Sequence, residues 1–111
     1  MDARLQRWMY AAAGYNALWG TAVVIFAHAV AWKCVGMLVA VYAPGYWLAA
    51  HRPHPELVGV GLLGKVFGPI GFAWAAATGR LPLQFGFVIL ANDLVWWPAF
   101  ATYLRRYRFS L

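Results

Sequence analysis

The chain has 111 residues, enough for one domain, and 64% of them are hydrophobic while only 11% are charged. A soluble domain this small needs far more polar surface, so the composition excludes an ordinary soluble fold and predicts an integral membrane protein whose solvent is the lipid bilayer. The formal net charge of +6 comes from basic residues that flank the apolar runs. That placement suits lipid headgroups and argues against nucleic acid as a partner.

The first apolar run covers residues 8–28, and it is close to the 20 or so residues that a helix needs to cross a bilayer. Arg4 and Arg7 precede it, and residues 27–29 (Ala-His-Ala) resemble the cleavage site of a signal peptide. The run is too long for a typical signal core and contains polar residues such as Asn16. We therefore interpret it as a retained span.

The second run covers residues 32–50 and follows a poorly marked connection. It contains Tyr42 and the single cysteine, Cys34, which excludes an intramolecular disulfide and is expected to be a buried structural residue. The run ends at the sequence HRPHP, because prolines and charges break a membrane helix. The same prolines prevent the loop histidines and Glu56 from forming a helical ligand face, so no metal site is predicted.

The third run, residues 56–78, carries a charge near its centre. Lys65 lies nine residues after Glu56, or roughly 14 Å at 1.5 Å per residue, where a charge is costly and is a candidate for function. Pro69 is expected to leave the carbonyl of Lys65 without its helical donor. Four glycines of this run share one helical face: Gly61, Gly64, Gly68 and Gly71. Their stripe predicts close helix packing, either within the bundle or between two copies of the chain.

The fourth run covers residues 83–104 and follows a Gly-Arg-Leu-Pro turn. Asp93 lies twelve residues before Arg105, or roughly 18 Å along a helix, so its depth matches that of Lys65. Pro98 is expected to lie inside this helix and to free the carbonyl four residues earlier.

The four runs together predict a polar site at mid-membrane depth. Its candidate residues are Lys65, Asp93, Asn92, Asn16 and Tyr42. Three interpretations remain open: a functional binding site, a structural ion pair between the lysine and the aspartate, or a lysine that extends to the cytoplasmic interface.

The distribution of basic residues predicts how the helices are oriented. One side of the membrane would carry Arg4, Arg7, Arg52, Arg105, Arg106 and Arg108, and the other only Lys33 and Arg80. The positive-inside rule then places both termini in the cytoplasm, as four spans also require. The predicted fold is an all-α, four-transmembrane-helix bundle, multi-pass in the inner (cytoplasmic) membrane of the cell.

Four stretches of the chain carry a family resemblance. They are YNALWG (15–20), CVGMLVAVYAPGYWLAA (34–50), GLLGKVFGPIGF (61–72) and NDLVWWPAF (92–100). These motifs resemble an uncharacterised family of small bacterial four-helix integral membrane proteins, and the overall plan is similar to the broader DoxX-like class. The resemblance implies the architecture and no particular activity.

The leading hypothesis is that the polar site binds a lipid-like or small apolar ligand, or a partner subunit. The alternative is a membrane enzyme or redox accessory acting on a quinone-like substrate, with Lys65 and Asp93 exchanging protons. The sequence shows no nucleophile–base pair or cofactor motif, so it identifies no catalytic residue and no cofactor. A small multidrug-type transporter would need a glutamate in the first span, which is absent. The expected partners are the lipid bilayer, a second copy of the chain or a partner membrane subunit.

Overall fold

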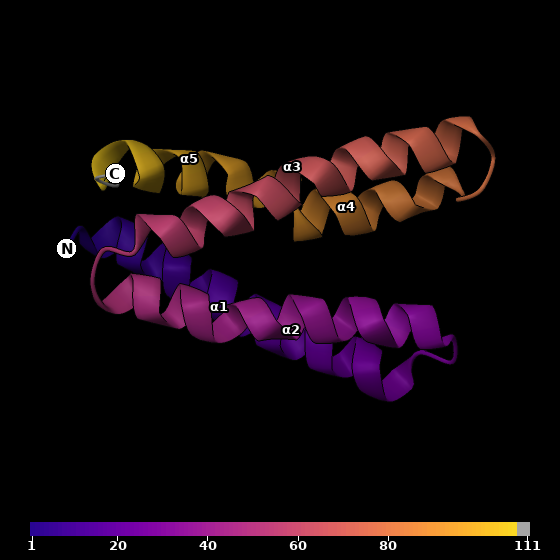
Figure 1. Cartoon of the computed structure of the whole chain (residues 1–111), viewed down its shortest axis with the longest axis horizontal. Coiled ribbons are helices and arrows are strands. Elements are labelled where there is room, and N and C mark those ends of the chain that lie inside the picture. Colours follow the sequence, from indigo (N-terminus) through magenta and orange to yellow (C-terminus); the bar gives the residue numbers. More distant parts are fainter. Residues whose placement is uncertain (109–111) are drawn as a thin grey trace.

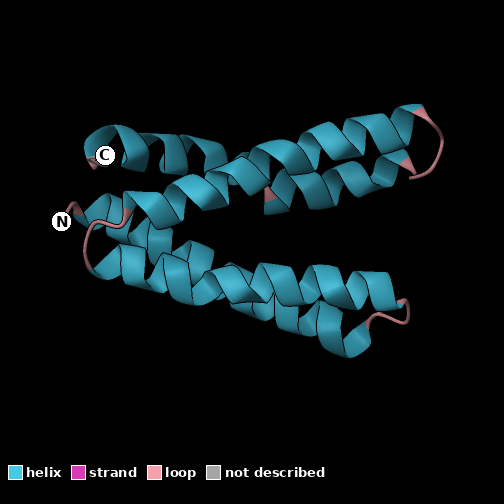
Figure 2. Ribbon diagram, viewed as in Figure 1, coloured by secondary structure: helices cyan, strands magenta, loops and turns pink. Residues whose placement is uncertain are grey.

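The structure, a computed structural model, describes residues 1–108 and is helical throughout, with no strand in that range (Figures 1 and 2). Its elements are α1 (Ala3–Phe26), α2 (Val30–His51), α3 (Pro55–Ala77), η1 (Leu83–Phe85), α4 (Gly86–Asn92), η2 (Leu94–Trp96) and α5 (Trp97–Arg106). Four segments, namely α1, α2, α3 and the stretch Leu83–Arg106, are long and apolar enough to cross a membrane. The prediction of an all-α chain with four such segments is confirmed.

The first helix begins at Ala3, five residues before the predicted start, because Asp2 caps it. The Asp2 carboxylate accepts hydrogen bonds from the backbone N–H groups of Arg4 (2.8 Å) and Leu5 (3.3 Å). The bonds from Leu5 and Arg4 hold the pKa of Asp2 below its ordinary value. The same carboxylate pairs with Arg106 at 2.9 Å, so the two ends of the chain lie together.

The helices form two hairpins that meet at one end of the molecule and diverge toward the other (Figure 1). One hairpin is α1 with α2, and the other is α3 with α4; both termini lie at the end where the hairpins meet. The hydrophobic core is confined to that terminal end. Its largest fully buried side chains are Tyr46, Tyr103, Phe100, Met9 and Val58.

Elsewhere many of the large apolar side chains point outward. Those on the outside include Leu18, Phe26, Val30, Leu38, Val41, Phe67, Leu83 and Phe87. Cys34 is also exposed, so the expectation that it is buried is wrong. It lies in the half of α2 that has no hydrophobic core to cover it.

Helices α1 and α2 approach each other closely at Gly20 and Gly36. A Cβ atom on Gly20 would lie 2.5 Å from the carbonyl oxygen of Gly36 and 2.6 Å from the backbone nitrogen of Ala40. A Cβ on Gly36 would lie 2.7 Å from the carbonyl oxygen of Gly20. Only glycine allows two backbones to come this near, so these two residues fix the geometry of the first hairpin.

The glycine stripe of α3 has different neighbours from those predicted. Gly61 lies against the ring and hydroxyl of Tyr46, and Gly68 lies against the carboxyl group of Asp93. A Cβ on Gly64 or Gly71 would meet no atom within 4 Å. Within the chain, the stripe therefore makes room for side chains and open space, and it does not hold a neighbouring helix backbone.

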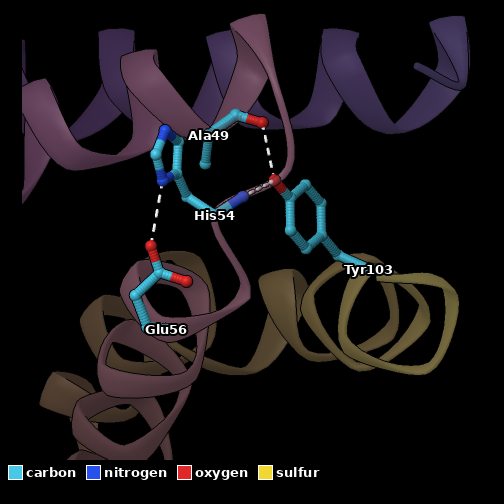
Figure 3. Close-up of polar contacts among 4 residues, drawn as sticks. All are labelled: Ala49, His54, Glu56 and Tyr103. Carbon is cyan, nitrogen blue, oxygen red and sulfur yellow. Dashed lines mark hydrogen bonds and ion pairs between the residues drawn. The ribbon is translucent and has the colours of Figure 1, made fainter. Parts of the chain in front are cut away.

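Tyr103 joins the loop between α2 and α3 to α5 (Figure 3). Its hydroxyl donates to the carbonyl of Ala49 (2.7 Å) and accepts from the backbone N–H of His54 (2.9 Å). The Ala49 carbonyl needs this donor because Pro53, four residues later, has no N–H. His54 also contacts Glu56, Nδ1 to Oε1, at 2.9 Å.

Replacing Tyr103 with phenylalanine should therefore lower the free energy of unfolding by about 2 kcal/mol, since a donor and an acceptor lose their partner inside the protein. Equilibrium unfolding in mixed micelles measures this loss. Tyr107→Phe is the matched control, because its hydroxyl accepts only one bond, from the N–H of Asp2 at the chain end. Equal losses in the two variants would contradict the role given to Tyr103.

Candidate functional site

The fourth membrane-length segment is interrupted at Asp93. Here φ is −121° and ψ is −61°, and α4 ends at the preceding residue. The N–H of Trp96 donates to the carbonyl of Asp93 at 3.2 Å, whereas in a continuous helix it would reach Asn92. The predicted span over 83–104 is present as a membrane-length segment, but the expectation that Pro98 lies inside its helix is wrong. Pro98 lies in the first turn of α5, where its missing N–H costs nothing.

Side chains satisfy the carbonyl groups around this interruption. The indole N–H of Trp96 donates to the carbonyl of Ala91 (2.9 Å), and Lys65 Nζ donates to that of Asn92 (2.7 Å). In the opposite direction, the indole N–H of Trp97 donates to the carbonyl of Lys65 (2.9 Å), the one that lacks its helical donor in α3. Lys65 and Trp97 thus each donate a side-chain hydrogen bond across the contact between α3 and the fourth segment, which satisfies buried backbone carbonyls on both sides.

Lys65 is only 6% exposed and turns its ammonium group inward. The Nζ atom lies 5.5–5.9 Å from the ring centroids of Tyr46, Trp96 and Phe100, within the range of cation–π attraction. Among residues 1–108, no carboxylate oxygen lies within 4.0 Å of it. The direct ion pair with Asp93 is therefore not formed, and the side chain does not extend to the interface.

The five polar residues singled out in the sequence surround one cavity of about 120 Å³, which we call the polar cavity. Its lining includes Asn16, Tyr42, Lys65, Asn92 and Asp93, with Val39, Tyr46, Gly61 and Gly64. Lys65 and Asp93 thus line the same cavity without forming an ion pair. Like Lys65, Asp93 is largely removed from solvent, with 8% of its surface exposed.

Two residues that line the polar cavity have buried amide oxygens without partners. Asn16 Nδ2 donates to the carbonyl of Val39 at 2.9 Å, which fixes the orientation of the amide. Its Oδ1 is then a buried acceptor with no hydrogen bond, and the Oδ1 of Asn92 is in the same state. A buried polar atom left unpaired costs free energy. An occupant of the adjacent cavity with hydrogen-bond donors would lower this cost if the amides turned toward it.

A larger cleft of about 310 Å³ lies between the two hairpins, on the side where they diverge; we call it the inter-hairpin cleft. Four aromatic residues from different elements line it: Trp19, Trp32, Phe72 and Phe85. Three of the four stripe glycines also line it: Gly64, Gly68 and Gly71. Trp32 and Phe85 stack at 5.3 Å between centroids and so join the two hairpins near their tips.

The inter-hairpin cleft and the polar cavity meet at residues that line both. These shared residues are Gly64, Asn92 and Asp93. A mostly apolar space that three glycines help to line is thus adjacent to a polar one. The break at Asp93 produces this arrangement because it ends α4 at the junction between the two spaces.

Sequence reasoning missed the aromatic side chains that complete the site. Trp96 and Trp97 were not recognised as donors to backbone carbonyls, although they follow Asp93 closely and an indole N–H at membrane depth needs an acceptor. Within residues 1–108, no three His, Cys, Asp or Glu side chains lie close enough together to hold a metal ion, and this includes the histidines of the central loop.

Compared with models of known protein families, with curated proteins and with solved structures, the chain matches none. The resemblance to small DoxX-like membrane proteins therefore stays a prediction, and the argument for function depends on the geometry of the chain itself.

Proposed function

We propose that the protein is a multi-pass integral membrane protein of the inner (cytoplasmic) membrane with four spans. Its outer surface supports this placement, because large apolar side chains cover the part of the molecule that has no core. Its long axis of 42 Å is close to the 40–45 Å or so of a bilayer with its headgroups. Four spans put the two termini on one side, where the structure also has them.

The cytoplasmic location of the termini is supported by where the cations lie. Six arginines belong to the terminal end of the chain or to the central loop beside it. At the opposite end, Lys33 donates to the carbonyl of Val24 at 2.6 Å, and the guanidinium of Arg80 lies 4.9 Å from the ring of Trp74. Both cations of that end are thus engaged in local contacts.

We further propose that the protein binds a small amphiphile within the membrane. The apolar body of the ligand would occupy the inter-hairpin cleft, and its polar head, bearing hydrogen-bond donors, would enter the polar cavity. The observation that carries this proposal is that the two spaces are adjacent and share Gly64, Asn92 and Asp93 as lining residues; the unpartnered amide oxygens of Asn16 and Asn92 support it. A mostly apolar cleft with a few convergent polar groups is the usual form of a small-molecule site.

Filling the cleft should abolish binding while the fold is kept. The double variant Gly64→Leu/Gly71→Leu places two side chains on the cleft floor, where a Cβ meets no atom within 4 Å. Native mass spectrometry after gentle extraction should show a small-molecule adduct on the wild-type chain, and at least about tenfold lower occupancy in the variant.

The matched control is Gly14→Leu, because Gly14 also has no atom within 4 Å of a built Cβ but does not line the cleft. This variant should keep the adduct. A wild-type chain without a small molecule, or one that carries a protein subunit in its place, would contradict the proposal. Equal loss of the adduct in the control would do the same.

A further inference from the structure

We propose that a second site, on the outer surface of the terminal end, binds the phosphate head of an anionic phospholipid. This site depends on the membrane placement above and not on the ligand of the inter-hairpin cleft. It begins between α1 and α5 and continues along the outer face of α1, and we call it the basic groove. None of its lining residues lines the cleft or the polar cavity.

The basic groove consists of two adjoining cavities, of about 270 Å³ and 300 Å³. The first is bounded by Leu5 of α1 and by Pro98, Ala99, Thr102 and Arg106 of α5, and the second by Arg7 and Ala11 of α1. Both are also lined by Arg4 and Trp8, and these two shared residues make them parts of one groove.

The charge of the groove suits a phosphate. It is lined by Arg4, Arg7 and Arg106, and its one acidic residue is Asp2. Three positive charges and one negative charge leave a net charge of +2. Arg106 pairs with Asp2, whereas neither Arg4 nor Arg7 has a carboxylate within 4.0 Å among residues 1–108. Guanidinium groups hold phosphate oxygens through paired hydrogen bonds, so these two arginines are available as ligands.

The apolar part of the groove distinguishes a lipid from a soluble phosphate. Ala11 lies seven residues beyond Arg4 along α1, or about 10 Å deeper into the membrane at 1.5 Å per residue. Between them lies Trp8, which is held edge-on against Trp96 at 5.7 Å between centroids. A head group at the arginines therefore places acyl chains over a rigid apolar surface, as the interface of a bilayer demands.

The test uses the full chain in detergent, with native mass spectrometry measuring lipid binding at equal lipid concentrations. The probes are dioleoyl phosphatidylglycerol and dioleoyl phosphatidylcholine, which share their acyl chains and differ in net charge, and soluble glycerol 3-phosphate. We expect phosphatidylglycerol to bind about tenfold more tightly than phosphatidylcholine. In the double variant Arg4→Gln/Arg7→Gln, the affinity for phosphatidylglycerol should fall by about tenfold or more, to that for phosphatidylcholine.

The control is Arg52→Gln, which removes one charge from the same end of the molecule but lies outside the groove. It should change the affinity for phosphatidylglycerol by less than about threefold. Equal binding of the two lipids would overturn the proposal, and so would a loss in the control as large as in the double variant. Competition by glycerol 3-phosphate at the concentration of the lipid would show an anion site that needs no acyl chains, which is also contrary to the proposal.

Thermal unfolding of each variant shows whether the fold is retained. If the double variant does not fold, the single variant Arg4→Gln is measured in its place.

Discussion

Replacing Gly20 with alanine should lower the free energy of unfolding by about 3 kcal/mol. The added methyl group would lie 2.5 Å from the carbonyl oxygen of Gly36 and 2.6 Å from the backbone nitrogen of Ala40. Backbone atoms cannot turn aside as the end of a flexible side chain can, so α1 and α2 must move apart along their contact. Equilibrium unfolding in mixed micelles gives the size of the loss.

Gly64→Ala is the control for this prediction. It also tests whether the glycine stripe of α3 packs closely, as the sequence predicts, or faces open space, as in the structure. Gly64 belongs to the glycine stripe of α3, from which close packing was predicted, yet a Cβ there meets nothing within 4 Å. Because alanine has the higher helix propensity, this variant should be unchanged or more stable by up to about 1 kcal/mol. A larger loss at Gly64 than at Gly20 would show that the stripe of α3 holds a partner, either a helix of this chain or a second copy.

Replacing Lys65 with methionine should destabilise the protein by a similar amount, about 3 kcal/mol. The variant keeps most of the side-chain volume but leaves the carbonyl of Asn92 without its donor and Asp93 without a nearby positive charge. Both groups are held away from solvent, where an unpaired polar or charged group is most costly. Adding Asp93→Asn removes the unbalanced charge and should restore part of the stability, while the Asn92 carbonyl stays unpaired. The same unfolding measurement serves for both variants.

Lys33→Met is the matched control, since Lys33 also donates to a backbone carbonyl, that of Val24. It lies at the tip of the first hairpin, near the water that can replace it, so its loss should cost less than about 1 kcal/mol. If the double variant of Lys65 and Asp93 is less stable than both single variants, the electrostatic coupling inferred between the two residues is wrong.

The part of the fold that the sequence predicted is the part that hydrophobicity and turn residues determine. The length of the apolar runs located four membrane-length segments, and the HRPHP sequence located the loop between α2 and α3 to within a few residues. Helical rise alone placed Lys65, Asp93 and Asn16 at one depth, and the structure has them around one cavity. These inferences need only local chain geometry, which is why a sequence suffices for them.

The parts that the sequence did not predict depend on contacts between segments. The break at Asp93 is stabilised by Lys65, which belongs to another helix, and by a tryptophan that replaces a backbone donor. Glycine spacing in α3 suggested a packing face, but whether a helix or open space faces a glycine depends on how the two hairpins diverge. The contact of Gly20 with Gly36 was missed because these glycines lie on different helices and form no motif within either one.

The confinement of the core to the terminal end has a mechanical consequence for the cleft at the other end. The two hairpins are packed together where Phe100 and Val58 are buried, and near their tips they meet through the stack of Trp32 on Phe85. At a distance of about 20 Å, equal to some 13 helical residues, a rotation of 5° or so at the core displaces a hairpin tip by nearly 2 Å. Side-chain volumes in the core therefore influence the width of the cleft from a distance, while the stack of Trp32 on Phe85 restrains it near the tips. On the function proposed above, a substitution in the core would change which ligands fit without contacting any of them.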